Sequence, residues 1–539
     1  MTIPMENRIV QRLAVIAVVL LLTALSLRPT LNSGFVNFDD DVYVLKNPQI
    51  RSLSPAGVGK MFRTTIEKVY SPLVTLSFAV EYHFYGLNPF VYHLDNLFLH
   101  LAVVCLAMIF GMQLGLGSVA SALAALLFGI HPMHVESVAW VTERKDVLYS
   151  FFYMLALCCY AGYLKKRTVA LYAAVVASGV LSLLSKPMAV SLPLALFLCD
   201  WYFERKRTVR SMVEKFVLGV IAVPIVWQTY SRHLDANAAD PIGSVLNGLW
   251  ALTFYVAKFF FPWPVEVFYK TPDVAASGLA YAGAAVFAGS MAVLLWRFRR
   301  NKIFVFAGFF YLLSIFFLVR ATHTFNYSPG GKPEFLVANR FMYLPSLGYC
   351  LLTGAVLKAF LEWSRTKGRM SLALAAALTA LLISWLSLES FRQCGNWKDG
   401  LHLWNAVIAG NPQSATAYNN RGTLQETVEL ALKDYSRCIE LDSDFPEAYF
   451  NRARIYAGMG RYDLAIADYT RCVALDPKDG ESFLLRSQAY VRQGRFDRAL
   501  KDALKAQSLG LKVNGDYLLR LSSYMPDADK CPLSVGSSP

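Results

Sequence analysis

Three consecutive carboxylates, Asp39, Asp40 and Asp41, follow the first long apolar run of the sequence. Carboxylates this close repel one another, and the repulsion raises the pKa of at least one of them. Their aromatic and apolar neighbours are expected to hold them near a membrane surface. A carboxylate held in this way can act as a general base or ligate a divalent cation. A solvated acidic turn or a helix cap is the alternative interpretation of the same residues.

A second group of ionisable residues lies between positions 131 and 146. Ionisable side chains at a membrane boundary cost free energy, so their density here indicates a functional site. His131, His134 and Glu136 are potential metal ligands, although their spacing matches no standard zinc motif. Capping of a helix that begins near Val135 would explain them equally well. The candidates drawn from this group are His131, His134, Glu136, Arg144 and Asp146.

A third group, His93, Asn96 and His100, recurs three and four residues apart within one apolar run. This spacing places the three side chains on one face of a helix, and that face must point into the protein rather than toward lipid. Hydrogen bonding between helices is the simpler explanation. A supporting role for His93 and Asn96 in a site is the alternative.

Two basic residues stand where a loop meets an apolar run. Arg340 precedes the run at 341–359, and Lys186 directly precedes Pro187. From such a position a guanidinium can bind a phosphate group through two parallel hydrogen bonds. Extension of the charged ends to the lipid headgroups is the alternative interpretation.

Membrane helices are the elements that must position these residues. Hydrophobic residues make up 55% of the 539 residues and charged residues 17%, compared with roughly half and a quarter in soluble domains. Apolar runs recur that are long enough to cross a bilayer, which takes about 20 residues. This pattern excludes a soluble globular enzyme, a collagen and a disordered chain. The net charge of +14 is concentrated in short loops, which indicates cytoplasmic loops rather than a nucleic-acid partner.

The apolar runs predict about eleven membrane helices, with ten and twelve as alternatives. A further apolar stretch at 245–261 ends in prolines and a tryptophan, which favours an interfacial or re-entrant segment. With the N-terminus inside, the count places 30–90, 132–146 and everything after 390 on the non-cytoplasmic side. The predicted helices cover residues 12–29, 91–112, 116–131, 147–164, 169–185, 188–203, 213–230, 277–296, 303–320, 341–359 and 371–389.

A 34-residue period appears in the polar C-terminal part of the chain. Arg452 recurs as Arg486, and Gly460 recurs as Gly494, which is the period of the tetratricopeptide repeat. An earlier copy that begins at Ala417 is about three residues short where its inter-helix turn is expected. The sequence therefore predicts an all-α protein with three parts: a polytopic membrane domain at 1–390, a tetratricopeptide-repeat α-solenoid at 391–513, and a partly disordered tail with a weak helix at 514–539.

Five motifs in this order, followed by the repeats, resemble those of the transmembrane-and-tetratricopeptide-repeat (TMTC) O-mannosyltransferases and their bacterial relatives. This family falls within the C-type glycosyltransferase (GT-C) superfamily, and the resemblance covers about residues 12–508. No single motif is unique, but the five in register are specific. The motifs run from Phe35 to Asp40, from Tyr92 to His100, from His131 to Asp146, from Arg340 to Gly348, and from Asn396 to Lys398.

The resemblance implies an inverting membrane glycosyltransferase with a GT-C-like helical domain. Such an enzyme moves a sugar from a polyprenyl-phosphate donor to a Ser or Thr hydroxyl of a protein, as in O-mannosylation, outside the cytoplasm. Asp39 aligns with the presumed base of the family, with Asp40 in support. Arg340 and Tyr343 match the Arg-x-x-Tyr-Leu-Pro signature of the family. The residues expected to bind the donor phosphate are Arg340, Arg144, Lys186 and Tyr343.

The expected partners are a polyprenyl-phosphate sugar and a protein or peptide acceptor, which the repeats would help to bind. The expected location is the inner membrane of a bacterium, with the active-site loops and the repeats in the periplasm. A divalent cation such as Mg²⁺ or Mn²⁺ is optional in this scheme, and no metal ligands are assigned. The array is shorter than in the animal proteins, which argues against a cadherin-like acceptor. The alternative function is a non-enzymatic membrane scaffold, or a transporter of lipid-linked precursors, with the repeats as a docking module.

Overall fold

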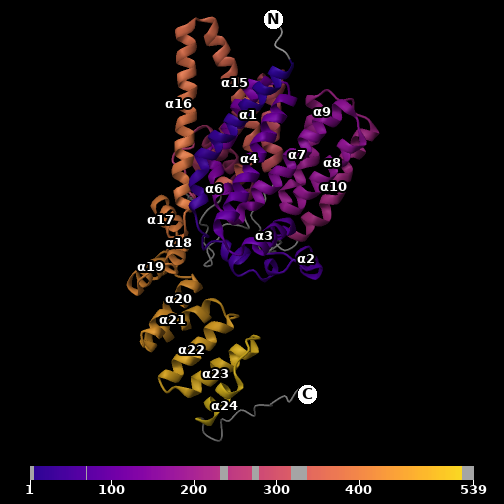
Figure 1. Ribbon diagram of the computed structural model, residues 1–539. Coiled ribbons are helices and arrows are strands. Elements are labelled where there is room, and N and C mark those ends of the chain that lie inside the picture. Colours follow the sequence, from indigo (N-terminus) through magenta and orange to yellow (C-terminus); the bar gives the residue numbers. More distant parts are fainter. Residues whose placement is uncertain (1–4, 68, 231–240, 270–277, 317–336, 525–539) are drawn as a thin grey trace. The chain divides into compact units, whose positions relative to one another are not determined.

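The computed structural model describes residues 5–67, 69–230, 241–269, 278–316 and 337–524. All regular elements in these residues are helices. The described residues divide into two compact units, 5–406 and 407–524, which are considered separately below (Figure 1). The all-α fold class predicted from the sequence is confirmed.

The first unit consists of mostly apolar helices, several of which begin at a proline. Proline suits the first turn of a helix because its ring fixes φ and its missing N–H has no partner there. In α4, Pro89 takes this position, and the side chain of Asn88 accepts a hydrogen bond from the N–H of Phe90 at 3.2 Å. The α-helices of this unit are α1 (Met5–Leu27), α2 (Pro55–Met61), α3 (Pro72–Tyr85), α4 (Pro89–Gln113), α5 (Gly117–Ile130), α6 (Val135–Ala139), α7 (Arg144–Lys166), α8 (Val169–Ser185), α9 (Leu192–Tyr202), α10 (Val209–Tyr230), α11 (Pro241–Phe260), α12 (Gly278–Arg297), α13 (Lys302–Ile315), α15 (Ser346–Thr366) and α16 (Arg369–Cys394).

Four helical segments of the described chain are long and apolar enough to cross a bilayer, and a fifth results if one bent pair counts as a single span. The bent pair joins Gly117–Ile130 to Pro132–Ala139 at 53°. The eleven predicted segments are helical over most of their described length, and the end of the segment at 303–320 lies outside the described residues. The total number of spans and the sidedness derived from it stay predictions. The four segments are Val10–Asn32, Pro89–Gln113, Val141–Lys166 and Arg369–Trp397.

The segment that follows α1 is folded against the membrane helices. Tyr43 and Val44 are buried in a core cluster with Val74 and Phe78 of α3, and Tyr92 of α4 belongs to the same cluster. The acidic residues that follow α1 are therefore held near the N-terminal ends of α4 and α7.

The second unit is a series of helical hairpins, as the repeat period predicts (Figure 1). α17 (Gly400–Gly410) begins in the first unit and ends in the second. The remaining helices are α18 (Ala415–Gly422), α19 (Val428–Leu441), α20 (Pro446–Gly458), α21 (Tyr462–Leu475), α22 (Gly480–Arg492), α23 (Phe496–Ser508) and α24 (Gly515–Ser523).

The first hairpin is about three residues shorter than the others, as predicted, but the residues are missing from a different place than the predicted inter-helix turn. Arg452 pairs with Asp468, and the equivalent Arg421 pairs with Asp434, but Arg421 precedes Arg452 by 31 residues rather than 34. α18 has 8 residues and α20 has 13, so the helix is shortened and not the turn after it. α18 ends at Gly422, where a Cβ would lie 2.7 Å from the ring of Tyr435.

Candidate active site

Asp40 is a buried carboxylate that fastens the segment after α1 to the start of α7. The residue is 1% exposed. One oxygen accepts hydrogen bonds from the N–H and the hydroxyl of Thr142, at 3.0 and 2.5 Å, and the other accepts one from the N–H of Val36 at 3.0 Å. Burial raises the pKa of Asp40 to about 6, while these hydrogen bonds oppose the increase. Both oxygens are thus occupied by structural contacts.

Asp39 is the carboxylate that remains available for chemistry. Its main-chain oxygen accepts hydrogen bonds from Val42 and Tyr43, at 3.1 and 2.9 Å, which fixes its backbone. Among the described residues, no hydrogen-bond donor contacts its carboxylate. Burial raises the pKa of Asp39, Lys145 lowers it, and Glu143 raises it again. A raised pKa brings a carboxylate closer to the basicity that a general base needs at neutral pH.

Arg340 lies in the 3₁₀ turn Asn339–Met342 that precedes α15. Its guanidinium donates to a carboxylate oxygen of Glu136 in α6, and its main-chain N–H lies 3.3 Å from the other oxygen. Its Nε is 3.7 Å from Glu143 Oε1. Arg340 and Glu136, which are 204 residues apart in the sequence, are therefore brought together as an ion pair.

Lys186 joins this group from the C-terminal end of α8. Its Nζ lies 2.5 Å from Asp146 Oδ1 and 3.4 Å from Glu143 Oε2. The other oxygen of Asp146 accepts a hydrogen bond from Ser137 Oγ at 3.0 Å. Glu143 therefore contacts both Lys186 and Arg340 and links the two predicted phosphate-binding cations.

Glu143 and Lys145 are members of this group that were not among the predicted site residues. Lys145 Nζ is 3.6 Å from Glu143 Oε1 and 4.4 Å from the centre of the Tyr43 ring. It is also the cation with the largest influence on the pKa of Asp39. We name these residues the charged cluster: Asp39, Glu136, Glu143, Lys145, Asp146, Lys186 and Arg340.

Arg144 was predicted to bind the donor phosphate, but its side chain points away from the charged cluster. The residue is 1% exposed, and its guanidinium lies 2.7 Å from Glu81 Oε1 in α3. It also donates to the side chain of Asn96 and, at 2.8 Å, to the main-chain oxygen of Tyr92. Successive residues of an α-helix point about 100° apart, so Arg144 and Lys145 cannot both face the same site. Arg144 ties α7 to α3 and α4, and Lys145 takes its place in the cluster.

The histidines and Asn96 bond mostly to the main chain of neighbouring elements. Asn96 Nδ2 donates to the main-chain oxygens of Val138 and Trp140, at 3.3 and 3.2 Å. His93 Nε2 is 3.3 Å from the oxygen of Gly34, and His131 Nε2 is 3.0 Å from that of Phe259. These contacts hold the backbone on which the charged cluster is built.

Tyr343 was also predicted to contact the donor phosphate, and it is fully buried. Its hydroxyl lies 2.6 Å from His100 Nδ1, and the neighbouring His134 has its Nε2 2.8 Å from Ser346 Oγ. Tyr343 therefore joins α4 to the start of α15 and supports the turn that carries Arg340.

Aromatic side chains cover the charged cluster on one side. Trp140 stacks on Phe38 and on Trp397, with ring centres 4.8 and 5.4 Å apart. The guanidinium of Arg340 lies 5.5 Å from the centre of the Trp140 ring. The motif at 396–398 thus acts through Trp397, which packs against the residue that flanks Arg340.

The optional divalent cation stays a prediction, and the surroundings of its potential ligands are as follows. Within the described parts of the chain, no three His, Cys, Asp or Glu side chains are grouped as metal ligands. Asp146 and Glu143 face Lys186 at 2.5 and 3.4 Å, and Glu136 faces Arg340. Protein cations therefore neutralise Glu136, Glu143 and Asp146.

A family model matches one repeat of this chain, and curated proteins match the chain over most of its length. Residues 446–479 match the family model of the tetratricopeptide repeat. A protein O-mannosyl-transferase of Caenorhabditis elegans is 23% identical over 461 residues, which cover 79% of this chain and 63% of the relative. Protein O-mannosyl-transferase TMTC3 of Homo sapiens is 23% identical over 490 residues, with 79% and 51% covered. The chain thus spans between about half and two thirds of these two relatives.

A shorter match is more similar in sequence. Protein O-mannosyl-transferase TMTC2 of Mus musculus is 42% identical over 100 residues, which cover 19% of this chain and 12% of the relative. Among solved structures, the oligosaccharyltransferase of Archaeoglobus fulgidus has a TM-score of 0.42 and 12% identity, with 87% of this chain and 72% of that chain covered. The resemblance predicted from the sequence is confirmed: the chain is a helical membrane protein similar to the transmembrane-and-tetratricopeptide-repeat protein O-mannosyl-transferases.

Proposed function

We propose that this protein is an inverting membrane glycosyltransferase of the C-type superfamily, which transfers a sugar from a polyprenyl-phosphate donor to a Ser or Thr hydroxyl of a protein. One observation carries the proposal. Asp39, whose carboxylate is not occupied by structural hydrogen bonds among the described residues, lies within the electrostatic reach of Lys145 and Arg340. A base for the acceptor and cations for a phosphate thus occur at one place.

Asp39 acts as the general base in this proposal. The acceptor hydroxyl attacks the anomeric carbon and gives its proton to the Asp39 carboxylate. The bond between the anomeric carbon and the phosphate oxygen breaks, and its electron pair leaves with the polyprenyl phosphate. The new bond forms on the opposite face of the sugar, so the anomeric configuration is inverted. Asp40 keeps the segment that carries Asp39 in place.

Arg340 and Lys186 stabilise the charge that develops on the departing phosphate, with Lys145 beside Asp39. Arg340 and Lys186 are more accessible than the carboxylates with which they pair. The side chains of Arg340 and Lys186 are 14% and 10% exposed, whereas their partners Glu136 and Asp146 are 2% and 1% exposed. The buried carboxylates orient the two cations, and the exposed side of each cation can then contact a ligand.

The position of the cluster suits a donor with a lipid tail. Glu143, Lys145 and Asp146 lie in the first residues of the candidate span Val141–Lys166. A polyprenyl chain beside such a helix end stays in hydrocarbon while its phosphate reaches the cations. The same position accounts for catalysis on a membrane scaffold rather than in a soluble enzyme. No step of the proposed mechanism requires a divalent cation.

The acceptor in this proposal is a protein segment that the tetratricopeptide repeats help to bind, because such arrays commonly bind peptides. The active-site loops and the repeats are proposed to face the periplasm. A cysteine introduced near the exposed Lys478 should react with a membrane-impermeant thiol reagent in intact spheroplasts. Reaction only after permeabilisation would place the repeats on the cytoplasmic side.

The proposed function is tested by a transfer assay with the purified full-length protein in mixed micelles. The donors are a panel of polyprenyl-phosphate hexoses and the matching nucleotide sugars, and the acceptors are Ser- and Thr-containing peptides. We expect a mass increase of one hexose with one lipid donor and none with nucleotide sugars. Asp41→Asn is the matched control, because Asp41 pairs with the exposed Lys46 at 3.1 Å outside the cluster. Two results would contradict the proposal: transfer only from nucleotide sugars, and a folded protein that transfers sugar from none of the donors.

A further inference from the structure

A cavity of about 700 Å³ opens at the end of α7 opposite the charged cluster. Along α7, Lys145 and Lys165 are separated by 20 residues, which corresponds to roughly 30 Å of helix at 1.5 Å per residue. The cavity is therefore separate from the proposed donor site. Its lining residues come from the end of α7, the connection between α9 and α10, and the first turn of α10: Leu164, Lys165, Arg167, Phe203, Glu204, Arg205, Lys206, Thr208 and Arg210.

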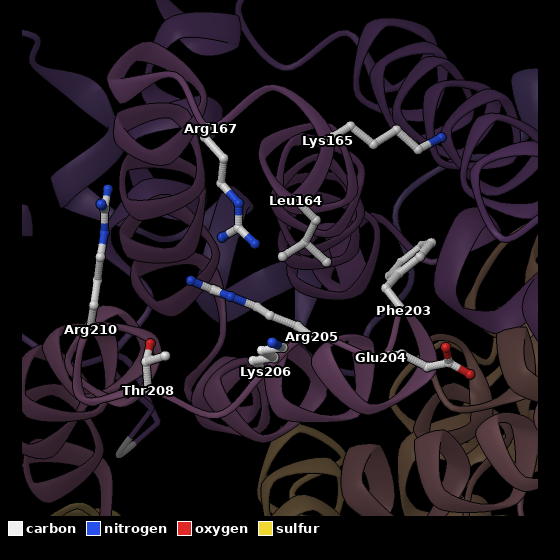
Figure 2. Close-up of a pocket in the computed structure, with 9 residues that line it drawn as sticks. All are labelled: Leu164, Lys165, Arg167, Phe203, Glu204, Arg205, Lys206, Thr208 and Arg210. Atoms are coloured by element: carbon white, nitrogen blue, oxygen red, sulfur yellow. The ribbon is translucent and has the colours of Figure 1, made fainter.

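The lining of this cavity is strongly cationic. For Lys165, Arg167 and Lys206, the structure shows no carboxylate within ion-pair distance among the residues it describes. The single acidic residue of the lining, Glu204, pairs with Lys302, which is outside the cavity. In Figure 2 the carboxylate of Glu204 points away from Arg167. The cavity thus holds several positive charges that the protein itself does not compensate.

Arg205 is held rigidly at the centre of this cavity. Its Nη1 donates to Glu214 Oε2 at 2.7 Å and to the hydroxyl of Tyr160 at 2.8 Å. The guanidinium groups of Arg167 and Arg205 lie 5.3 and 5.9 Å from the centre of the Tyr163 ring. Both side chains extend into the middle of the cavity in Figure 2. Two guanidinium groups placed in advance match the planar, multidentate recognition of a phosphate group.

An exposed apolar stripe on α10 begins next to this cavity. Val209, Val213, Phe216 and Val220 recur at helical spacing and are 82%, 52%, 71% and 51% exposed. The stripe begins at the first residue of α10, beside the cavity residue Thr208. A free phosphate ion would use only the cations. A ligand with both a phosphate and hydrocarbon chains would use the cavity and the stripe together.

We propose that this cavity binds the headgroup of an anionic phospholipid, with its phosphate on Arg167, Arg205 and Lys206 and its acyl chains along the α10 stripe. Basic pockets between membrane helices recognise anionic headgroups through the same combination of charge and adjacent apolar surface. Positive charge in loops alone would explain the sidedness of the helices. Sidedness alone would not require two guanidinium groups at 5.3 and 5.9 Å from the centre of one ring, next to an apolar helix face.

Lipid binding by the full-length protein in uncharged detergent micelles tests this proposal. Dioleoylphosphatidylglycerol is added at increasing mole fraction, and bound lipid is counted by native mass spectrometry, with dioleoylphosphatidylcholine as the zwitterionic comparison. We expect saturable binding of the anionic lipid. The double variant Arg167→Gln with Lys206→Gln should weaken that binding about 30-fold. The control, Arg299→Gln with Arg300→Gln, removes the same charge from exposed residues outside the cavity and should weaken binding by less than about threefold.

Three results would overturn the assignment. Equal losses in the two double variants would mean that binding reflects surface charge in general. Competition by inorganic phosphate or glycerophosphoglycerol at the concentration of the lipid would identify a free-phosphate site without an acyl contribution. Equal retention of phosphatidylcholine would exclude selection for anionic headgroups. If the double variant fails to fold, Phe216→Ser on the exposed stripe provides the test, because it should weaken lipid binding and leave binding of glycerophosphoglycerol unchanged.

Discussion

Replacement of Thr142 by valine removes one of the three hydrogen bonds that hold the Asp40 carboxylate. The hydroxyl of Thr142 donates to Asp40 Oδ1 at 2.5 Å, while the N–H of Thr142 and that of Val36 remain as donors. A hydrogen bond to a charged group contributes about 1.5–3 kcal/mol, and one between neutral groups about 0.5–1.5 kcal/mol. We therefore expect Thr142→Val to lower the free energy of unfolding more when Asp40 is ionised than when it is protonated.

The pH range of this effect follows from the pKa of Asp40. Its folded pKa is raised by burial from 3.8 to about 6, so the folded protein binds this proton more tightly than the unfolded chain. The resulting stabilisation is fully present below pH 3.8 and is lost as the pH rises through 6. At 1.36 kcal/mol per pKa unit, the loss amounts to about 3 kcal/mol. The Thr142 hydroxyl lowers the folded pKa, so Thr142→Val should raise it further.

The measurement is the free energy of unfolding in detergent micelles at pH 4.5 and pH 8, for the parent protein and Thr142→Val. The difference between the two proteins should be about 1.5–3 kcal/mol at pH 8 and smaller at pH 4.5. Thr30→Val is the matched control, because the buried Thr30 hydroxyl donates to a neutral carbonyl, that of Leu27, at 2.8 Å. Its effect should be equal at the two pH values. If Thr142→Val lowers the free energy of unfolding by the same amount at both pH values, the role given to Asp40 is refuted.

Three further changes separate the residues of the charged cluster from those that support it. Lys145→Gln removes a cation that lowers the pKa of Asp39, so the acidic limb of the pH–rate profile of transfer should move to higher pH; an unmoved limb would separate Lys145 from the base. Arg340→Lys keeps the charge but loses the two-pronged geometry, so the KM for the lipid donor should rise more than the KM for the acceptor; an unchanged donor KM in Arg340→Ala would reduce Arg340 to an interfacial anchor. Arg144→Gln leaves Glu81 buried without its partner and should lower the free energy of unfolding by about 3–5 kcal/mol with no change in donor KM; a selective rise in donor KM would return Arg144 to the phosphate site.

The fold could be predicted largely from the sequence because its signals are local. Apolar runs predict helices from hydrophobicity alone, and the 34-residue period predicts the hairpins of the second unit. The place of the missing residues in the first hairpin could not be predicted from the period. The ring of Tyr435 in α19 lies against Gly422 at the end of α18, and a contact between two helices is not visible in the period. Local patterns also do not determine the number of membrane spans, because several of the apolar helices are shorter than a full span.

The site was predicted less completely, and α7 shows why. Residues 143–146 carry two basic side chains between two acidic ones, and the sequence does not say which of them face the cluster. Glu81, which is 63 residues earlier, decides this by pairing with Arg144. Lys145 is then left to face Asp39. A helical projection of α7 together with a search for buried acids on other helices would have raised Lys145 and Glu143 as candidates.

The difference between Asp39 and Asp40 also depends on tertiary structure. The two residues are neighbours in the sequence, but only Asp40 meets Thr142, which is 102 residues away. The resemblance to the family predicts Asp39 as the base. Among the described residues no hydrogen-bond donor contacts the Asp39 carboxylate, and its cationic neighbours give a physical reason for the same choice.

The central claim is that Asp39 takes the proton of the acceptor hydroxyl, and the turnover of Asp39→Asn in the transfer assay tests it most directly. The substitution keeps the shape of the side chain and removes its basicity, so turnover should fall by about 10²- to 10⁴-fold. Thermal stability should stay unchanged, since no described hydrogen bond depends on the Asp39 carboxylate. Asp41→Asn should lower turnover by less than about tenfold. Near-normal turnover by folded Asp39→Asn would contradict the account.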